Sequence, residues 1–243
     1  MKPLLRWIAL VLLAVLALQV FFVARIALMA AVSPQSSAFE RSEAWRILSE
    51  RGRLRWRQQW VDYPRISEHL KRAVIASEDD SFSYHDGVDW EAVEKAWQKN
   101  SQSGAQVAMA SFKGAKTVAP QKLVGASTIT QQLAKNLFLT GERTFLRKGQ
   151  EFVLTYALEK LLDKQRILEL YLNHVEWGEG VFGAEAAAQH YYRKPALHLT
   201  AQEAARLSVM LPRPRYFEKL PRSSYLAERA AVIASRLDHA ELP

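Results

Sequence analysis

Cysteine is absent from the 243-residue sequence. That absence excludes disulfide bonds and thiolate metal sites, although it does not fix the cellular compartment. Acidic residues are absent from one long stretch, because no Asp or Glu lies between Lys95 and Gly141. The same stretch contains Lys95, Lys99, Lys113, Lys116, Lys122 and Lys135. It is therefore either a solubilising basic loop or a surface that accepts an anion without competition from nearby acids.

The whole chain is basic, with a net charge of +8 and a pI near 9.7. This balance favours anionic partners such as nucleic acid, an anionic membrane surface or a phosphorylated substrate. Hydrophobic residues make up 49% of the chain, which is normal for a folded protein and argues against global disorder. The length fits one globular domain of ordinary size with a membrane segment, and is short for two domains.

The N-terminal segment has the composition of a membrane span. No charged residue lies between Trp7 and Ala24, and Gln19 is the only clearly polar side chain there. At helical rise, about 18 such residues nearly cross a hydrocarbon core. Lys2 and Arg6 precede the span, which favours a cytoplasmic N-terminus.

A cleavable secretory signal is the competing interpretation of this segment. The apolar run is longer than that of a usual signal sequence, and the site after it, Ala30-Ala31-Val32, is poor for cleavage. We therefore favour an uncleaved anchor, and in either case the remainder of the chain is exported. The predicted organisation is a membrane anchor over 1–32, a linker over 33–55, and a globular domain over 56–243.

Arginine alternates with apolar residues just before the globular domain. Leu54, Trp56 and Trp60 would share one face of a strand with arginines on the other face. Trp56 and Trp60 would also align on a helix, so the type of element stays open. This segment either lies in a membrane interface or packs its tryptophans as a short strand.

From Ile66 onward the apolar spacing predicts helices and no strand–helix alternation, so we expect an all-α fold without a parallel sheet. Trp90, Val93 and Trp97 are expected to form the apolar stripe of a helix capped by Asp89. Helices are predicted at 66–78, 89–97, 128–137, 145–162, 164–173, 183–192, 200–211 and 223–239. Buried leucines in the helix over 145–162 are expected at Leu154, Leu158, Leu161 and Leu162. The Gly-, Ser- and Lys-rich residues 101–122 are expected to form a loop.

The first candidate site is an acidic cluster at the end of the helix over 66–78. Its members are Glu78, Asp79, Asp80, His85, Asp86 and Asp89. Clustered carboxylates repel one another and raise some pKa values, which suits a general base. Glu78, at the end of an otherwise apolar helix, is the candidate, whereas capping, turn or surface roles are favoured for the acids after Asp79. A metal site formed by Asp79, Asp80 and His85 is a weaker hypothesis, because no ligand spacing is clean.

The second candidate segment runs over 125–136. Gln131 and Gln132 lie one helical turn before Lys135, so two amides and an ammonium share a face. A helix that begins just after a glycine also favours anions at its N-terminus. An ordinary exposed polar face is the alternative, and this segment alone does not exclude it.

The third candidate is a basic pair followed by an acid. Arg147 and Lys148 lie one turn before Glu151. An intrahelical ion pair is the alternative, but base-before-acid is the less favourable order for such a pair. Two adjacent cations with an acid one turn later would suit a diphosphate.

The glycine spacing from Gly178 to Gly183 matches the dinucleotide-binding signature, but the structural context of that signature is missing. That signature requires a preceding strand and a βαβ unit. Here a helix ending near Asn173 precedes the glycines, so we predict a tight turn and no nucleotide site.

Taken together, these segments resemble the peptidoglycan glycosyltransferases of the monofunctional, membrane-anchored type. The resemblance covers roughly residues 56–220, and no penicillin-binding transpeptidase domain follows, so glycosyl transfer alone is expected. The motifs occur in the order of the family: Glu78-Asp79 with Phe82, His85, Gly87 and Asp89; Gly125 through Leu139; Arg147-Lys148 with Glu151 and Glu159; Lys164 to Asn173 with Gly178, Gly180, Gly183 and Tyr191; and Thr200 to Pro214.

The resemblance implies a lysozyme-like helical fold with an apolar flank near the membrane. It implies a lipid-linked disaccharide-peptide pyrophosphate and the growing glycan strand as substrates, and a divalent cation, magnesium or manganese, as a helper. It also implies a single-pass protein of the inner membrane with a periplasmic catalytic domain. Other cell-wall synthesis proteins are possible partners, and nucleic acid is not expected.

The resemblance also assigns roles to the candidate residues. Glu78 matches the catalytic base, which deprotonates the acceptor 4-hydroxyl for attack on the donor with inversion, releasing polyprenyl pyrophosphate. Glu151 would organise the cations or a metal, and Asp79 is a weaker metal candidate. The pyrophosphate-binding set is Gln131, Gln132, Lys135, Arg147 and Lys148.

Two alternative functions remain at this stage. One is a lysozyme-like hydrolase or lytic transglycosylase, although a neutral glycosidic leaving group needs a proton donor and no cation cluster. The other is a catalytically silent membrane scaffold of the cell-wall machinery. Because every motif lies after residue 56, a chain beginning near Ala44 is expected to fold without the anchor.

Overall fold

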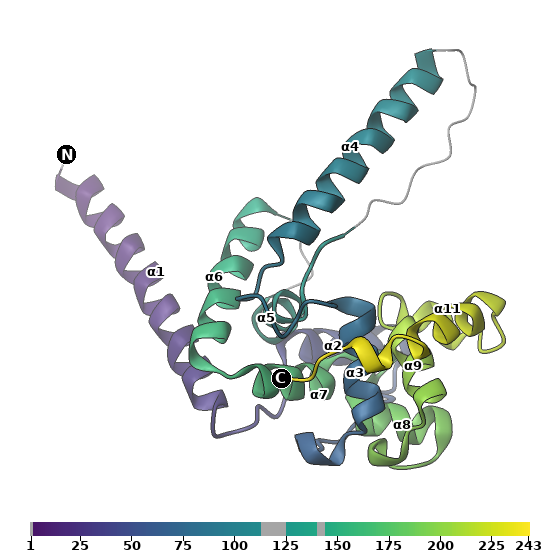
Figure 1. Cartoon of the computed structure of the whole chain (residues 1–243). Coiled ribbons are helices and arrows are strands. Elements are labelled where there is room, and N and C mark those ends of the chain that lie inside the picture. The colour runs from purple at the N-terminus through teal and green to yellow at the C-terminus, as the bar shows by residue number, and fades with distance from the viewer. Residues whose placement is uncertain (1, 113–124, 140–143) are drawn as a thin grey trace.

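The computed structural model of the chain describes residues 2–112, 125–139 and 144–243. Helices dominate these ranges, which confirms the predicted fold class (Figure 1). The α-helices are α1 (Lys2–Met29), α2 (Ala38–Arg51), α3 (Glu68–Glu78), α4 (Trp90–Phe112), α5 (Ile129–Phe138), α6 (Phe145–Leu161), α7 (Lys164–His174), α8 (Ala184–Tyr192), α9 (Ala201–Met210), α10 (Pro214–Glu218) and α11 (Ser224–Ala234). Three short strands accompany them: β1 (Arg57–Gln58), β2 (Glu176–Gly178) and β3 (Val181–Phe182).

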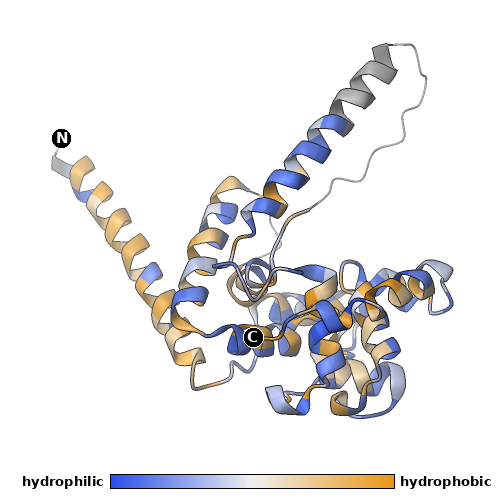
Figure 2. Ribbon diagram, viewed as in Figure 1, coloured by the Kyte–Doolittle hydropathy of each residue, from blue (hydrophilic) through white to orange (hydrophobic). Residues whose placement is uncertain are grey.

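The helix α1 projects from the globular part as an apolar arm (Figure 2). Its 27 residues from Pro3 to Met29 are long and apolar enough to cross a membrane. Only its last turns pack inward, where Ile26 and Met29 are buried. Arg166 fixes this end, because its Nε donates to the Met29 carbonyl at 2.8 Å.

The core is built where helices from distant parts of the sequence meet. The helix α3 packs on α9 and α11, while α5 packs on α6 and α7. Leu70, Val74, Leu133, Leu137 and Leu158 are fully or almost fully buried at these contacts. This packing orders the segment that follows Glu78 against the start of α5.

Local sequence signals set the starts of several helices. Thr128 and Gln131 have the spacing of a capping box, and the box is present at the start of α5: Gln131 N donates to Thr128 Oγ1, and Thr128 N donates to Gln131 Oε1. The helix α2 has the same device at Ser37 and Glu40. The predicted linker over 33–55 therefore contains a helix, α2, over Ala38–Arg51.

The strands form one small sheet in the order β1-β3-β2. The β1 strand is parallel to β3, and β2 is antiparallel to β3. The expectation of no parallel pairing is therefore wrong for the two-residue ladder between β1 and β3. The turn between β2 and β3 holds Gly180 at φ 74°, and Gly183 follows at φ 84°. A Cβ on Gly180 would lie 2.1 Å from the Arg55 carbonyl oxygen, so only glycine fits. The glycine pattern is thus a tight turn, as predicted.

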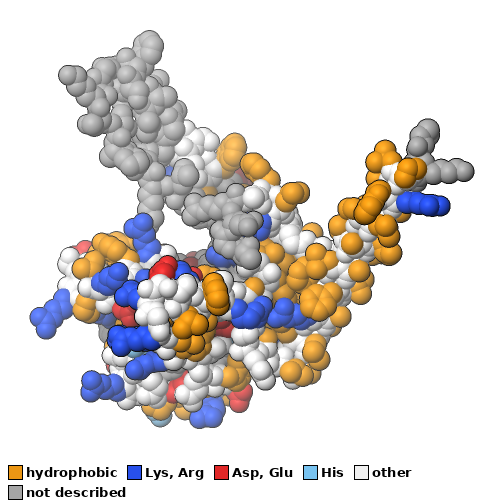
Figure 3. Space-filling view, turned by 180° about the vertical axis from the view of Figure 1, so that it is seen from behind, with side chains coloured by type: hydrophobic (Ala, Val, Ile, Leu, Met, Phe, Trp, Pro, Cys, Tyr) orange, Lys and Arg blue, Asp and Glu red, His pale blue; other side chains and the backbone are white. Residues whose placement is uncertain are grey.

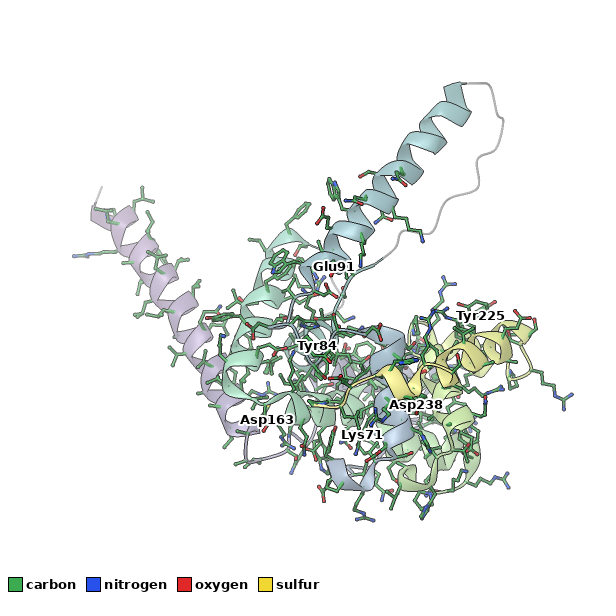
Figure 4. The ribbon with its side chains drawn as sticks, viewed as in Figure 1. Lys71, Tyr84, Glu91, Asp163, Tyr225 and Asp238 are labelled. Atoms are coloured by element: carbon green, nitrogen blue, oxygen red, sulfur yellow. The ribbon has the colours of Figure 1, made fainter. Side chains whose placement is uncertain are left out.

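The C-terminal segment returns to α3 and the loop after it. Arg72 Nη1 donates to the Ala240 carbonyl at 2.5 Å, and Ser83 Oγ donates to the Glu241 carbonyl at 2.8 Å. Figure 4 labels Tyr84 in this loop and Asp238 near the C-terminus. The segment therefore supports the loop that carries the acidic cluster.

Some predicted details of the helices are wrong. The helix α4 continues through Phe112, so residues 101–112 are not the expected loop, while 113–122 lie outside the described residues. Trp90 and Trp97 are 70% and 75% exposed, and Ala96 is the buried residue between them. Leu161 is 39% exposed and is therefore not buried as predicted. Spacing predicted a helix over 89–97, but which face is covered depends on how α4 projects from the domain (Figure 1).

Candidate active site

Glu78 is the last residue of α3 and lies half-buried in the structure. Its Oε2 accepts a hydrogen bond of 3.1 Å from Gln132 Nε2 on α5. Burial raises the pKa of Glu78 above its ordinary value, the neighbouring Asp79 adds to that rise, and Gln132 and Lys135 oppose it. A half-buried carboxylate with a raised pKa is suited to accept a proton.

Tyr171 on α7 holds the Gln132 side chain from inside the core. Its hydroxyl donates to Gln132 Oε1 at 3.0 Å, and its side chain is almost completely buried. The hydroxyl turns the Gln132 amide so that the NH₂ group faces Glu78. Tyr171 was not predicted from the sequence, because a tyrosine on the apolar face of a helix indicates only core packing.

Asp79 is buried and already occupied on both oxygens. His85 Nε2 lies 2.8 Å from Oδ1, and Ile129 N donates to Oδ2 at 2.9 Å. Asp79 therefore ties the loop after Glu78 to the N-terminus of α5, where a carboxylate is favoured.

These contacts bear on the predicted metal role of Asp79. Over residues 2–112, 125–139 and 144–243, no group of three or more His, Cys, Asp or Glu side chains is placed to hold a metal ion. Both oxygens of Asp79 and both oxygens of Glu151 already contact protein nitrogen atoms. The divalent cation stays a prediction from the family resemblance.

A cationic cleft of about 470 Å³ lies beside Glu78. Arg147 Nη1 and Lys148 Nζ contact the two oxygens of buried Glu151, at 2.9 Å and 2.5 Å. The ion pair that sequence considered as an alternative is thus present, and it lines the cleft. Of the predicted residues, Gln131, Gln132, Lys135, Arg147, Lys148 and Glu151 line this cleft.

Lys135 contributes a further ammonium to the cleft. Desolvation lowers its pKa, Glu151 opposes that change, and Arg147 and Lys148 lower the pKa further by repulsion. Within the described part of the chain, Lys135 forms no ion pair shorter than 4 Å. Its charge is therefore available to an anion that enters the cleft.

The cleft and the acidic cluster meet at Ser127. Glu78 and Asp79 line an adjoining hollow of about 220 Å³, and Ser127 lines both spaces. A proton acceptor therefore faces one space while cations line the next. The hydrogen bond between Glu78 and Gln132 crosses the boundary.

Gln131 is less available than sequence predicted. It is buried, and its side-chain oxygen accepts from Thr128 N in the capping box. Sequence analysis also missed other residues that line the cleft, namely Phe39, Asn136, Val175, Glu176 and Pro214. They come from elements whose approach depends on tertiary packing, although Asn136 and Pro214 lay inside segments already singled out.

The site places a carboxylate with a raised pKa beside a cleft lined by cations. The chain belongs to the transglycosylase family, because the family model described as Transglycosylase matches residues 46–238. It is a glycosyltransferase. This finding confirms the resemblance drawn from the motifs.

Relatives in several bacteria extend the match over most of the chain. A protein of Burkholderia thailandensis is 52% identical over 94% of this chain and 83% of its own length. A protein of Paraburkholderia phytofirmans is 48% identical over 98% of this chain and 94% of its own length. A protein of Burkholderia orbicola is 51% identical over 94% of this chain and 86% of its own length. Each of these relatives is named biosynthetic peptidoglycan transglycosylase.

Proposed function

We propose that this transglycosylase polymerises the glycan strands of peptidoglycan. Its substrates are a lipid-linked disaccharide-peptide pyrophosphate and the growing strand, which carries the same lipid pyrophosphate. The observation that carries the proposal is the junction at Ser127, where the Glu78 hollow opens beside the cleft of Lys135, Arg147 and Lys148.

The cationic cleft binds the donor pyrophosphate. Pyrophosphate is already a good leaving group, so the reaction needs neutralisation of developing charge more than a strong acid. Arg147 and Lys148 provide charge-assisted hydrogen bonds, and Lys135 adds a third positive charge. Glu151 holds Arg147 and Lys148 in place before the substrate arrives.

Glu78 activates the acceptor. It takes the proton of the 4-hydroxyl on the acceptor's N-acetylglucosamine, and that oxygen bonds to the anomeric carbon of the donor's N-acetylmuramic acid. The bond from that carbon to the pyrophosphate oxygen breaks, and polyprenyl pyrophosphate leaves with the electron pair. Attack from the face opposite the leaving group inverts the anomeric centre.

The anchor helix lies beside the helix that lines the cleft. Gln19 on α1 and Gln150 on α6 exchange two hydrogen bonds, of 2.9 Å and 3.1 Å. The neighbouring residue on α6, Glu151, lines the cleft. A lipid-linked substrate can therefore keep its chain in the bilayer while its pyrophosphate occupies the cleft.

Exposed side chains support the same placement. The helix α6 exposes Phe145 at 98% and Leu146 at 89%, which suits contact with a lipid surface. Figure 3 shows apolar side chains covering the α1 arm and basic side chains spread over the globular part. We place the chain in the inner membrane as a single-pass protein, with a cytoplasmic N-terminus and a periplasmic catalytic domain.

The lytic alternative is less compatible with the cleft. Cutting a neutral glycosidic bond calls for a second carboxylic acid as proton donor. Both oxygens of Glu151 are held by Arg147 and Lys148, so Glu151 does not stand free to serve as that proton donor. A scaffold without catalytic activity would not need the hydrogen-bonded arrangement of Glu78, Gln132 and Tyr171.

One assay separates the three functions. Purified full-length protein in detergent is incubated with lipid-linked disaccharide-peptide, and the products are separated on a gel. Long glycan strands are expected. Soluble fragments released from preformed wall would indicate a hydrolase, and neither product would indicate a scaffold.

A further inference from the structure

A second pocket, of about 670 Å³, lies beside β1 and the turn between β2 and β3. Three of the residues that line it are Arg53, Arg55 and Arg57, and all three are exposed. We call this pocket the arginine pocket.

The segment that carries these arginines is held firmly. Arg57 N donates to the Gly180 carbonyl at 2.8 Å, and the Arg55 carbonyl lies against Gly180, where no side chain would fit. Trp56, between them in sequence, stacks on Phe182 with ring centroids 4.5 Å apart. The guanidinium groups therefore extend from a fixed backbone, which lowers the entropy lost when they bind a ligand.

The acids of the arginine pocket are already engaged. Glu179 contacts Arg51 at 3.2 Å and Arg46 at 3.6 Å. Glu218 accepts from Glu179 N at 2.9 Å and lies 3.2 Å from His190 Nε2. Within the described residues, none of the three alternating arginines forms an ion pair. The pocket therefore has a surplus of positive charge on one side.

Two helices lead from the catalytic cleft to the arginine pocket. On α2, Phe39 lines the cleft and Ile47 lines the arginine pocket. On α10, Pro214 lines the cleft and Glu218 lines the arginine pocket. The eight residue steps from Phe39 to Ile47 span about 12 Å at helical rise.

The strand β2 and its turn make the same connection, with Glu176 at the cleft and Glu179 at the arginine pocket. Between the two spaces, Arg215 bridges Glu43 at 2.5 Å and Glu176 at 2.7 Å. The two pockets are thus neighbours across a surface of neutralised charges.

We propose that the arginine pocket binds carboxylates of the peptides on the growing glycan strand after its sugars leave the cleft. This inference rests on the proposed polymerisation. The strand repeats a disaccharide that carries a peptide, and a peptide presents at least its terminal carboxylate. Sugars alone are neutral and would not call for three unpaired guanidinium groups, whereas carboxylates match their fork geometry.

The arginines could instead serve the sheet or the membrane. Arg57 on β1, with the two arginines before it, could protect an exposed edge, because β1 is an edge strand of the sheet. They could also attract the anionic headgroups of a bilayer. The proximity of the arginine pocket to the cleft favours the glycan strand over both.

The test uses full-length protein in which Arg53, Arg55 and Arg57 are all replaced by Gln. The matched control replaces Arg222, Arg229 and Arg236 by Gln; these residues are also exposed, and their replacement removes the same charge. A third protein carries Lys at positions 53, 55 and 57, which keeps the charge if the Gln variant folds poorly. Circular dichroism verifies folding.

Three probes are compared by binding titration. They are lipid-free glycan strands with intact peptides, the same strands after removal of the peptides, and vesicles containing phosphatidylglycerol. The Gln variant should bind peptide-bearing strands about tenfold more weakly than wild type. The control should stay within about twofold of wild type. The Lys variant should bind between wild type and the Gln variant, because it keeps the charge and loses the guanidinium fork. Peptide-free strands should bind all four proteins alike.

Three results would overturn the inference. Equal weakening for peptide-free strands would show that the arginines contact sugars, and weakening confined to vesicles would show a membrane surface. Unchanged binding of every probe would indicate that the arginines protect the sheet edge and bind none of these ligands. A wild-type protein that makes no glycan strands would instead refute the proposed function, which separates that failure from this one.

Discussion

The Tyr171 hydroxyl donates to the Gln132 amide oxygen, and the Gln132 amide nitrogen donates to Glu78. Tyr171 lies on α7, Gln132 on α5 and Glu78 on α3, so three helices contribute to this chain of hydrogen bonds. Without the hydroxyl, the Gln132 amide could rotate and turn its oxygen toward the carboxylate. The hydrogen bond from Gln132 favours the ionised form of Glu78 and opposes the rise of its pKa through burial. Tyr171 is therefore a positioning residue that acts on the base from inside the core.

Replacing Tyr171 with Phe should raise the pKa of Glu78 further, because the ionised form loses a fixed donor. The acidic limb of the polymerisation rate should then move to higher pH, and activity should recover at alkaline pH. Tyr191→Phe is the matched control, since the Tyr191 hydroxyl donates to the Trp177 carbonyl and not to the site. An unchanged acidic limb in Tyr171→Phe would show that the hydroxyl serves packing alone.

Glu78→Gln keeps the size of the side chain but removes the proton acceptor. The polymerisation rate should fall by about a hundred- to ten-thousand-fold, as expected for loss of a general base. Binding of the lipid pyrophosphate donor should change little, because its cations are untouched. Gel assays of initial rate and a donor-binding titration check both, and a near wild-type rate would contradict the assignment.

The stability of the same variant gives an independent check. Burial raises the pKa of Glu78, so the folded chain holds this proton more tightly than the unfolded chain does. The wild-type fold is therefore weakened as pH rises from the ordinary pKa to the raised one. At neutral pH, Glu78→Gln should unfold at the same or higher denaturant concentration, and any gain should shrink in acid.

Glu151→Gln should disturb the anion site itself. Glu151 holds Arg147 and Lys148, so its loss frees both cations and leaves their geometry less fixed. Donor affinity and rate should change together, and the free energy of unfolding should fall by about 1–3 kcal/mol. Donor titration with denaturant unfolding measures both quantities. Loss of chemistry with donor binding intact would instead make Glu151 the base.

Local signals were sufficient for much of this site. The Thr128–Gln131 capping box and the helical spacing of Arg147, Lys148 and Glu151 are contacts within one helix, and sequence spacing specifies them. Glu78 was found because a carboxylate ended an apolar helix.

Contacts between helices were not accessible in the same way. Tyr171 has the spacing of a core residue, and nothing in its helix indicates that its hydroxyl meets Gln132. Phe39 lines the cleft only because α2 folds back against α5. The exposure of Trp97 likewise depends on where α4 projects.

The position of α2 leads to the last prediction, on how much of the N-terminus can be removed. Sequence motifs suggested that a chain beginning near Ala44 would fold, but Glu40 is buried and bonds to three partners. Its carboxylate accepts from Ser37 N at 2.6 Å and from Gln58 Nε2 at 2.9 Å, and lies 2.8 Å from His174 Nδ1. His174 is completely buried, so removing Glu40 leaves a polar ring without that partner.

A chain beginning at Ser33 should therefore fold in detergent and retain polymerising activity, because it keeps the Ser37 cap and Glu40. A chain beginning at Ala44 should lose about 1–3 kcal/mol of unfolding free energy for each buried polar group left unpaired. It should also bind donor more weakly, because Phe39 no longer lines the cleft. Full-length Glu40→Gln isolates the contact with His174 from the loss of α2. Equal stability of the two shortened chains would show that α2 is only a tether between the anchor and the domain.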